Sequence, residues 1–266
     1  MSVKKILFIN TETEPYVPES VLSKIGRAIP EAVQGSGYEI RTFMPKWGNI
    51  NERRGQLHEV IRLSGMNIII DGTDHPLIIK VASIPVSRVQ VYFIDNDDYF
   101  THRSMELDGN GVLYEDNLER AVFFARGVIE TVKKLRWIPD VIYCQGWMSA
   151  IVPLYIKRAY HDEPCYSDVK VVAGLSSMNI DGVFGKNAKA SIAFRDIDAE
   201  MLKDYPDDFT LQDMAKLAID HADGIIEMTE DVNADIKAIA IEAGKKYLEY
   251  PGTPFIESYK TFFESL

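Results

Sequence analysis

The sequence predicts an α/β protein built on an open, doubly wound, Rossmann-like parallel sheet. Short apolar runs alternate with amphipathic segments, which is typical of parallel strands linked by helices. Residues 6–9 form a continuous apolar run, as in a strand buried on both faces, and a turn and helical spacing over 20–34 follow it. Three β-like segments between residues 66 and 96 predict an antiparallel excursion within this sheet.

The other elements follow from the same two periodicities. Strands are expected over 6–9, 39–44, 66–71, 75–84, 88–96, 140–145, 170–176 and 224–229. Helices are expected over 20–34, 115–136, 148–159, 209–221 and 230–243. Pro30 lies inside the first helix and should kink it or end it early. Ligands of such sheets bind beyond the carboxyl ends of the strands, so candidate site residues are sought just after each strand.

Composition limits the classes of partner. The 266 residues are 46% hydrophobic, and 40 acidic against 29 basic residues give a net charge of -11. Nucleic acids and anionic membranes attract a concentrated positive field, so we expect neither as a partner. Two cysteines do not make a disulfide framework, and no apolar stretch approaches the roughly 18 residues that span a membrane. We expect a cytoplasmic protein.

Several motifs are absent or incomplete. The sequence has no GxGxxG after a strand, no Walker loop and no GxSxG. Residues 108–119 have the length of a calcium loop, but Val112 and Leu113 occupy positions that need an oxygen ligand and a glycine. The five histidines are scattered without ligand spacing. The acidic run at 95–98 is interpreted as a solvated turn. We expect neither a metal nor a cofactor.

Three longer segments carry a family resemblance. VYFIDNDDYF (91–100), YEDNLERAVFFARGVIE (114–130) and WIPDVIYCQGW (137–147) closely resemble the N-terminal lobe of bacterial glycogen synthases and plant starch synthases. Those enzymes are ADP-glucose-dependent glucosyltransferases with two Rossmann-like lobes. ILFINTETEPY, MPKWGNI, GLSSMNIDGVFG and ADGIIEMTEDVNADI extend the similarity over about residues 3–240. The resemblance implies one N-terminal lobe over 1–250 and a tail helix at 251–266 that packs back on it.

The sequence departs from the family where the family binds its ligand. The family's KTGGL loop, whose lysine and glycines approach the phosphates of the sugar nucleotide, is matched by residues 18–22, PESVL. Pro18 replaces the cation and Glu19 adds an anion, while Ser20 and Val21 fill the glycine positions. The histidine of the family's HDW motif is matched by Gln145, and that of its TIHN motif by Ser176.

Other family positions are retained. Asp116 and Asn117 match at the start of the long helix, and we interpret them as structural supports for the loop before it. Trp147 also matches, and its alternatives are packing at a helix start and stacking against a sugar. The resemblance gives a candidate substrate-binding set, vestigial or repurposed, of Pro18, Glu19, Ser20, Val21, Asp116, Asn117, Gln145, Trp147, Ser176 and Asp181. No residue is assigned a catalytic role.

Three functions remain open at this point. We expect a glycogen/starch synthase-like lobe that is non-catalytic alone and binds a glucan, another sugar or a partner enzyme. The family's second lobe would begin roughly where this sequence ends, at Leu266. One alternative is therefore an active glucosyltransferase half that uses a sugar nucleotide and is completed by a second-lobe protein or a homodimer. The other alternative is a structural or interaction protein.

Overall fold

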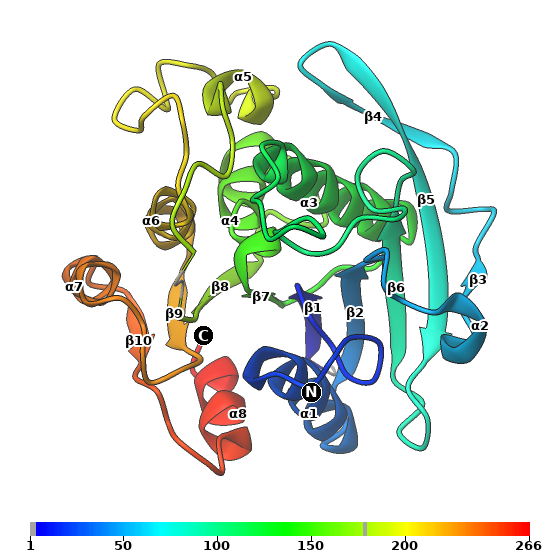
Figure 1. Cartoon of the computed structure of the whole chain (residues 1–266). Coiled ribbons are helices and arrows are strands. Elements are labelled where there is room, and N and C mark those ends of the chain that lie inside the picture. Colours follow the sequence, from blue (N-terminus) through cyan, green and yellow to red (C-terminus); the bar gives the residue numbers. More distant parts are fainter. Residues whose placement is uncertain (1–3, 178–179) are drawn as a thin grey trace.

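The computed structural model describes residues 4–177 and 180–266 and contains one open mixed sheet with helices on both faces (Figure 1). The strands lie in the order β10-β9-β8-β7-β1-β2-β6-β5-β3, and β4 pairs with β5. Neighbours from β10 to β6 are parallel. The pairs that β5 makes with β3, β4 and β6 are antiparallel. The predicted fold class, including its antiparallel excursion, is confirmed.

The bounds of the elements are as follows. The strands are β1 (Lys5–Asn10), β2 (Glu39–Pro45), β3 (His58–Glu59), β4 (Met66–Ile70), β5 (Thr73–Ser83), β6 (Gln90–Asp95), β7 (Val141–Gln145), β8 (Lys170–Leu175), β9 (Gly224–Glu227) and β10 (Lys246–Leu248). The helices are α1 (Val21–Gly35), α2 (Glu52–Gly55), α3 (Asn117–Lys134), α4 (Val152–Leu154), α5 (Ala188–Ile192), α6 (Leu211–His221), α7 (Ala234–Glu242) and α8 (Ile256–Glu264). A 3-10 turn, η1 (Trp147–Ser149), and a π-helical turn, η2 (Tyr155–Ala159), flank α4.

The strand order reverses at β1. From β1 the chain continues outward through β2 and β6, and it later returns to place β7 on the other side of β1. Asn10, the last residue of β1, pairs with Gln145, the last residue of β7. Because open α/β sheets bind ligands in the crevice at such a reversal, the carboxyl ends of β1 and β7 locate the candidate site.

Of the two outcomes expected for Pro30, a kink in α1 or an early end, the early end does not occur. The helix runs on to Gly35 with Pro30 buried inside it. A proline has no N–H to donate to the carbonyl four residues earlier, which here belongs to Gly26. The side-chain amide of Asn10 donates to that carbonyl instead, over 3.1 Å. The sheet therefore satisfies the acceptor that the proline leaves free.

The two faces of the sheet bury different sets of side chains. On one face, α1 and α8 cover Phe8 and Tyr143 through apolar residues that include Ile29 and Phe263 (Figure 1). On the other face, α3, α4 and α6 pack over the strands within the larger core. The edge of Phe263 contacts Phe8 and Tyr143, with ring centroids 6.1 and 5.6 Å apart. The short C-terminal helix thus contributes to the core.

The helix α3 lies inside the protein along most of its length. The sheet covers one of its sides, and β4 passes across another, where the Arg126 guanidinium donates to the carbonyl of Ile69. A side chain at Gly127 would meet Leu77 and Ile94 at 3.1 and 3.2 Å. The sheet and β4 therefore pack against two different sides of α3 and bury both.

The segment 148–159 is not the single continuous helix that the sequence suggested. It consists of η1, α4 and η2 in succession. Pro153 lies in the first turn of α4, where a missing N–H leaves no intrahelical partner unsatisfied. The break in the helix therefore coincides with the position of this proline.

Candidate functional site

The turn after β1 and the start of α1 form one wall of the candidate site. Ser20 caps α1, since its Oγ accepts from the Ser23 N–H at 2.9 Å and its own N–H donates to the Ser23 Oγ at 2.8 Å. The Ser20 hydroxyl also donates to the Glu12 carboxylate at 2.6 Å. The cap therefore fixes both the helix start and the orientation of Glu12.

Two cavities adjoin along this wall. The larger, of about 570 Å³, is lined by Glu12, Ser20, Val21, Leu22, Ser176, Ser177, Thr229, Glu230, Asp231 and Tyr250. The smaller, of about 290 Å³, is lined by Glu12, Pro18, Glu19, Ser20, Asn49, Ser104, Met105, Glu106 and Leu107. Glu12 and Ser20 belong to both linings and therefore form the wall between them.

The described lining of these cavities is acidic. It contains five carboxylates, those of Glu12, Glu19, Glu106, Glu230 and Asp231, and no Lys, Arg or His. Burial raises the pKa of Glu12, an effect that the Ser20 hydrogen bond opposes and the charge of Glu106 reinforces. Burial likewise raises the pKa of Glu106. Glu19 is exposed and pairs with Lys24, which lowers the pKa of the Glu19 carboxyl.

Hydroxyl groups and one aromatic ring complete the larger cavity. Ser176 is 8% exposed, and its Oγ makes no hydrogen bond to any residue within 4–177 and 180–266. The Thr229 hydroxyl accepts from the Ser177 N–H at 2.8 Å. Tyr250, which lines the same cavity, is half-buried, and its backbone N–H donates to the Glu227 carboxylate at 3.1 Å. The cavity therefore offers several acceptors and one aromatic face.

Glu227 holds that wall in place from beneath the cavity. Its carboxylate accepts from the Tyr247 hydroxyl and forms an ion pair of 3.0 Å with Lys237. Burial alone would raise the pKa of Glu227, but hydrogen bonds from Tyr247, the Tyr250 backbone and Lys237 lower it overall. The end of β9 is thus tied to β10 and to the loop that bears Tyr250.

Gln145 lies near the candidate site without lining either cavity. Its side chain is fully buried, and its amide donates to the Leu22 carbonyl at 2.5 Å. Its Oε1 lies 3.1 Å from the position that a Cβ on Gly26 would occupy. Gln145 therefore supports the underside of α1.

Asp116 and Asn117 stabilise the loop between β6 and α3. Asp116 forms a two-pronged ion pair with Arg103, one contact measuring 2.7 Å. Asn117 donates to the Glu106 carbonyl at 3.0 Å and accepts from Arg120 at 2.7 Å. Arg120 is fully buried, and its Nε donates to the Tyr99 carbonyl at 2.9 Å. Both residues thus contribute to the position of Glu106 without lining a cavity themselves.

Trp147 and Asp181 also lie outside the two linings. Trp147 is 8% exposed and packs against Phe184 and Trp47, with ring centroids 5.3 and 6.2 Å away. Asp181 is exposed. Of the ten residues singled out from the sequence, the structure brings Pro18, Glu19, Ser20, Val21 and Ser176 together along the cavities.

Several lining residues were not predicted from the sequence. Glu12, Thr229, Glu230 and Asp231 follow the carboxyl ends of β1 and β9 directly, and that position was the available signal for them. Tyr250 likewise follows the carboxyl end of a parallel strand, β10, but this strand of three residues was not predicted from the sequence.

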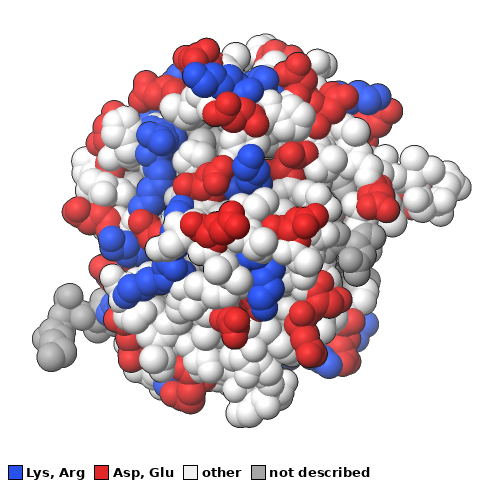
Figure 2. Space-filling view, turned by 90° about the vertical axis from the view of Figure 1, so that its left-hand side faces the viewer, with Lys and Arg blue, Asp and Glu red and all other residues white. Residues whose placement is uncertain are grey.

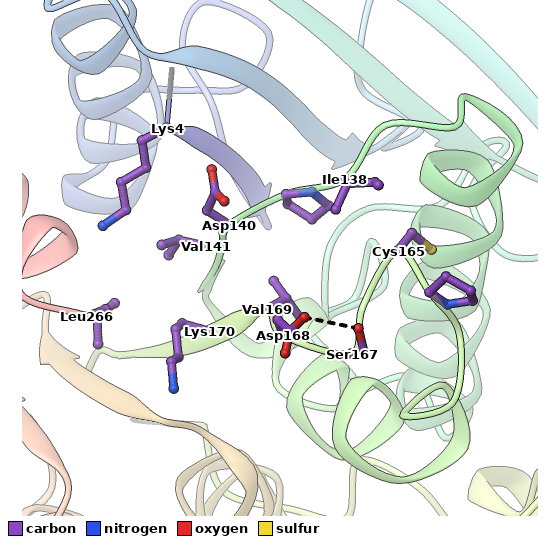
Figure 3. A pocket seen from close by; sticks show the side chains of 12 residues that line it. Lys4, Ile138, Asp140, Val141, Cys165, Ser167, Asp168, Val169, Lys170 and Leu266 are labelled. Atoms are coloured by element: carbon purple, nitrogen blue, oxygen red, sulfur yellow. Dashed lines mark hydrogen bonds between the residues drawn. The ribbon is translucent and has the colours of Figure 1, made fainter. Parts of the chain in front are cut away.

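A third cavity lies at the opposite edge, by the amino ends of β1, β7 and β8 (Figure 3). It has a volume of about 560 Å³, and its lining includes Lys4, Asp140, Cys165, Asp168 and Lys170. Lys4 is already engaged with the Phe263 carbonyl, and Asp140 accepts from the Lys5 N–H at 2.7 Å. The charged groups here tie the strand ends to one another and to α8.

Three further observations concern surface charge, metal-binding groups and membrane-spanning helices. On the face beside α6 and α7, Lys and Arg are interspersed with Asp and Glu, and no broad single-sign field forms (Figure 2). Within the described ranges, no group of three or more His, Cys, Asp and Glu is placed to hold a metal ion. No helix in this part of the chain is long and apolar enough to cross a bilayer.

Comparisons with known proteins identify relatives of this chain. The family described as "Starch synthase catalytic domain" matches residues 5–245. The glycogen synthase of Chlorobium limicola is 36% identical over 180 residues, which are 67% of this chain and 37% of that protein. The glycogen synthase of Chlorobaculum tepidum is 36% identical over 185 residues, which are 69% of this chain and 38% of that protein.

A solved structure agrees in fold. The catalytic domain of starch synthase IV from Arabidopsis thaliana, bound to ADP and acarbose, superposes with a TM-score of 0.73 at 15% identity. The match covers 94% of this chain and 51% of that one. The chain therefore spans between about a third and a half of the length of the relatives it matches. With its doubly wound sheet and the family match over residues 5–245, this chain belongs to the starch synthase catalytic domain family of glycogen/starch synthase-like glycosyltransferases.

Proposed function

We propose that this domain binds a glucan or a related sugar and does not transfer glucose from a sugar nucleotide by itself. The observation that carries the proposal is the charge of the two cavities: five carboxylates and no cationic side chain in their described lining. A nucleoside diphosphate carries negative charge that needs donors or cations nearby. A neutral polyhydroxylated ligand has no such requirement.

The chemistry of the larger cavity suits a sugar. Carboxylates accept hydrogen bonds from sugar hydroxyls, and the hydroxyls of Ser176 and Thr229 can both donate and accept. Tyr250 supplies an aromatic face for a sugar ring. A volume of about 570 Å³ is in the usual range of small-molecule sites and leaves room for a short oligosaccharide.

The start of α1 is poorly suited to bind a phosphate. Helix N-termini attract phosphates when the backbone N–H groups are free and the approach is open. Here the Ser23 N–H is taken by the Ser20 side chain, and Val21 projects from the first turn with 53% exposure. The Glu12 and Glu19 carboxylates lie beside that turn. These groups disfavour a diphosphate at this position.

A second candidate is glucosyl transfer by this domain together with a second lobe, supplied by another chain or by a dimer. The retained scaffold favours it, since Asn117 and Arg120 still hold the loop above the sheet. The starch synthase IV domain that shares this fold is bound to ADP and acarbose. In this case cationic groups from the second lobe would compensate the acidic cavities.

Calorimetric titration with maltotriose and with ADP-glucose tests the proposal. We expect heat of binding with maltotriose and none with ADP-glucose. Tyr250→Ala should weaken maltotriose binding, whereas Glu249→Ala, at a neighbouring residue outside the lining, should not. Tight binding of ADP-glucose, or release of ADP from it in the presence of a glucan, would contradict the proposal and favour transfer.

A further inference from the structure

We infer that the cavities favour an amine-bearing oligosaccharide, of the glucosamine type, over the neutral glucan of the same linkage. The inference rests on the proposed sugar-binding function and names the ligand class of that same site. It combines a cavity of suitable size, wall carboxylates that have no cationic partner among the described residues, and the Ser176 hydroxyl, which makes no hydrogen bond to them.

Three carboxylates of the larger cavity have no cationic partner among the described residues. Glu230 and Asp231 stand at the rim, where both are exposed, and neither forms an ion pair with a described residue. Glu12 accepts from Ser20 but has no cationic partner within the described ranges. Like charges that face one cavity raise its negative potential, and a protonated amine lowers the energy of all three carboxylates at once.

Glu12 lies between the two cavities and is held in a fixed orientation. Glu12 lines both cavities, so an amine placed beside Glu12 lies between the pair at the rim and the Glu19 and Glu106 side of the smaller cavity. Glu12 is also held in place, because the Ser20 hydroxyl fixes one of its oxygens at 2.6 Å. A fixed carboxylate loses little side-chain freedom when it binds a cation, which strengthens the contact.

The Ser176 hydroxyl offers a hydrogen-bonding group for a hydroxyl of the sugar. Ser176 is more than nine-tenths buried and lines the larger cavity, with its Oγ unbonded among the described residues. Because Ser176 lines the cavity, a ligand hydroxyl placed beside it can form a hydrogen bond with its Oγ. The cavity lining therefore suits a ligand that carries both hydroxyls and a positive charge.

The test compares sugars that differ only in the amine. The glucosamine trimer, cellotriose and the N-acetylated trimer share one linkage, and only the first carries positive charge, at a pH at which its amines are protonated. We expect the glucosamine trimer to bind roughly fivefold or more tightly than the other two, as the contribution of a few charged contacts requires. Added salt should reduce that advantage.

Substitutions test whether the preference for the glucosamine trimer depends on Glu12. Glu12→Gln keeps the shape of the side chain and an acceptor oxygen but removes the charge, so the ratio of glucosamine-trimer affinity to cellotriose affinity should fall toward one. Glu249→Gln, a charge change outside the cavity lining, should leave the advantage intact. Equal affinity for the three trimers, or an advantage that Glu12→Gln does not reduce, overturns the inference.

The outcomes separate this inference from the proposed function. If maltotriose binds and the glucosamine trimer shows no advantage over cellotriose, the amine preference is wrong and the sugar-binding function stands. If none of these sugars binds, the proposed function fails and the inference fails with it.

Discussion

The side-chain amide of Gln145 donates a hydrogen bond of 2.5 Å to the carbonyl oxygen of Leu22, which joins the carboxyl end of β7 to the first turn of α1. The Oε1 of the same side chain lies 3.1 Å from where a Cβ on Gly26 of α1 would stand. The position matched to a family histidine thus carries a side chain that holds the site's wall from below.

Replacing Gln145 by alanine should destabilise the fold. The change removes the bond to Leu22 and leaves an empty volume beneath α1, and we expect a loss of about 1–3 kcal/mol in the free energy of unfolding. Urea denaturation of both proteins measures it. The control is Gln34→Ala, at an exposed residue of the same helix, which should change that free energy by less than about 0.5 kcal/mol. Equal effects of the two substitutions would refute the structural role.

Gly26→Ala should destabilise the protein through a direct clash. A Cβ at Gly26 would lie 2.2 Å from the backbone oxygen of Glu12, which cannot move without displacing the turn after β1. We expect a loss of about 1–3 kcal/mol. Gly35→Ala, at the end of the same helix with nothing within 4 Å, should be neutral or stabilising by up to about 1 kcal/mol. A thermal unfolding series of the two variants distinguishes these outcomes.

Glu227 should make stability depend on pH in the acid range. Its pKa is lower in the folded protein than in the unfolded chain, so its contribution is present above the unfolded value of about 4.3 and is lost as the pH falls through the folded value. Glu227→Gln should therefore destabilise the protein at neutral pH and flatten its loss of stability below about pH 5. Denaturant titrations at several pH values test this. Parallel curves for the two proteins would argue against the assignment.

The C-terminal helix gives a fourth prediction, which also tests the proposed division at residue 250. Phe263 is 1% exposed and packs against Phe8 and Tyr143, so Phe263→Ala should cost about 3–5 kcal/mol. The neighbouring Thr261 is exposed, and Thr261→Ala should change the free energy of unfolding by less than about 0.5 kcal/mol. Deletion of residues 255–266 should lower the melting temperature or cause aggregation. An unchanged melting temperature would show that the tail is dispensable.

Much of the fold could be predicted because the central parallel strands are buried on both faces and therefore show as apolar runs. The expected strand over 6–9 is β1, and the expected helix over 115–136 contains α3. The fate of Pro30 could not be predicted, since it depends on Asn10, a residue that is distant in sequence and adjacent only after folding. The short strands β3 and β10 carry too few residues for a periodic pattern.

From the sequence, only those site residues could be placed whose location follows directly from their position after a strand. Pro18 to Val21 lie at the carboxyl edge because they follow β1. The acidic character of the wall could not be predicted from the sequence, because Glu12, Glu106 and Asp231 come from three separate loops that meet only in the folded protein. Gln145 was placed at the correct edge, but its direction beneath α1 follows from its bond to Leu22.

The burial of α3 bears on how such domains diverge. A helix enclosed by the sheet, by β4 and by the loop before it can change a side chain only if the neighbours change in step, so its sequence should drift slowly whatever the protein does. The segment 114–130, which spans most of α3, lies within the range that matches the family. Similarity in such a segment follows from packing and does not by itself fix the chemistry at the acidic turn after β1.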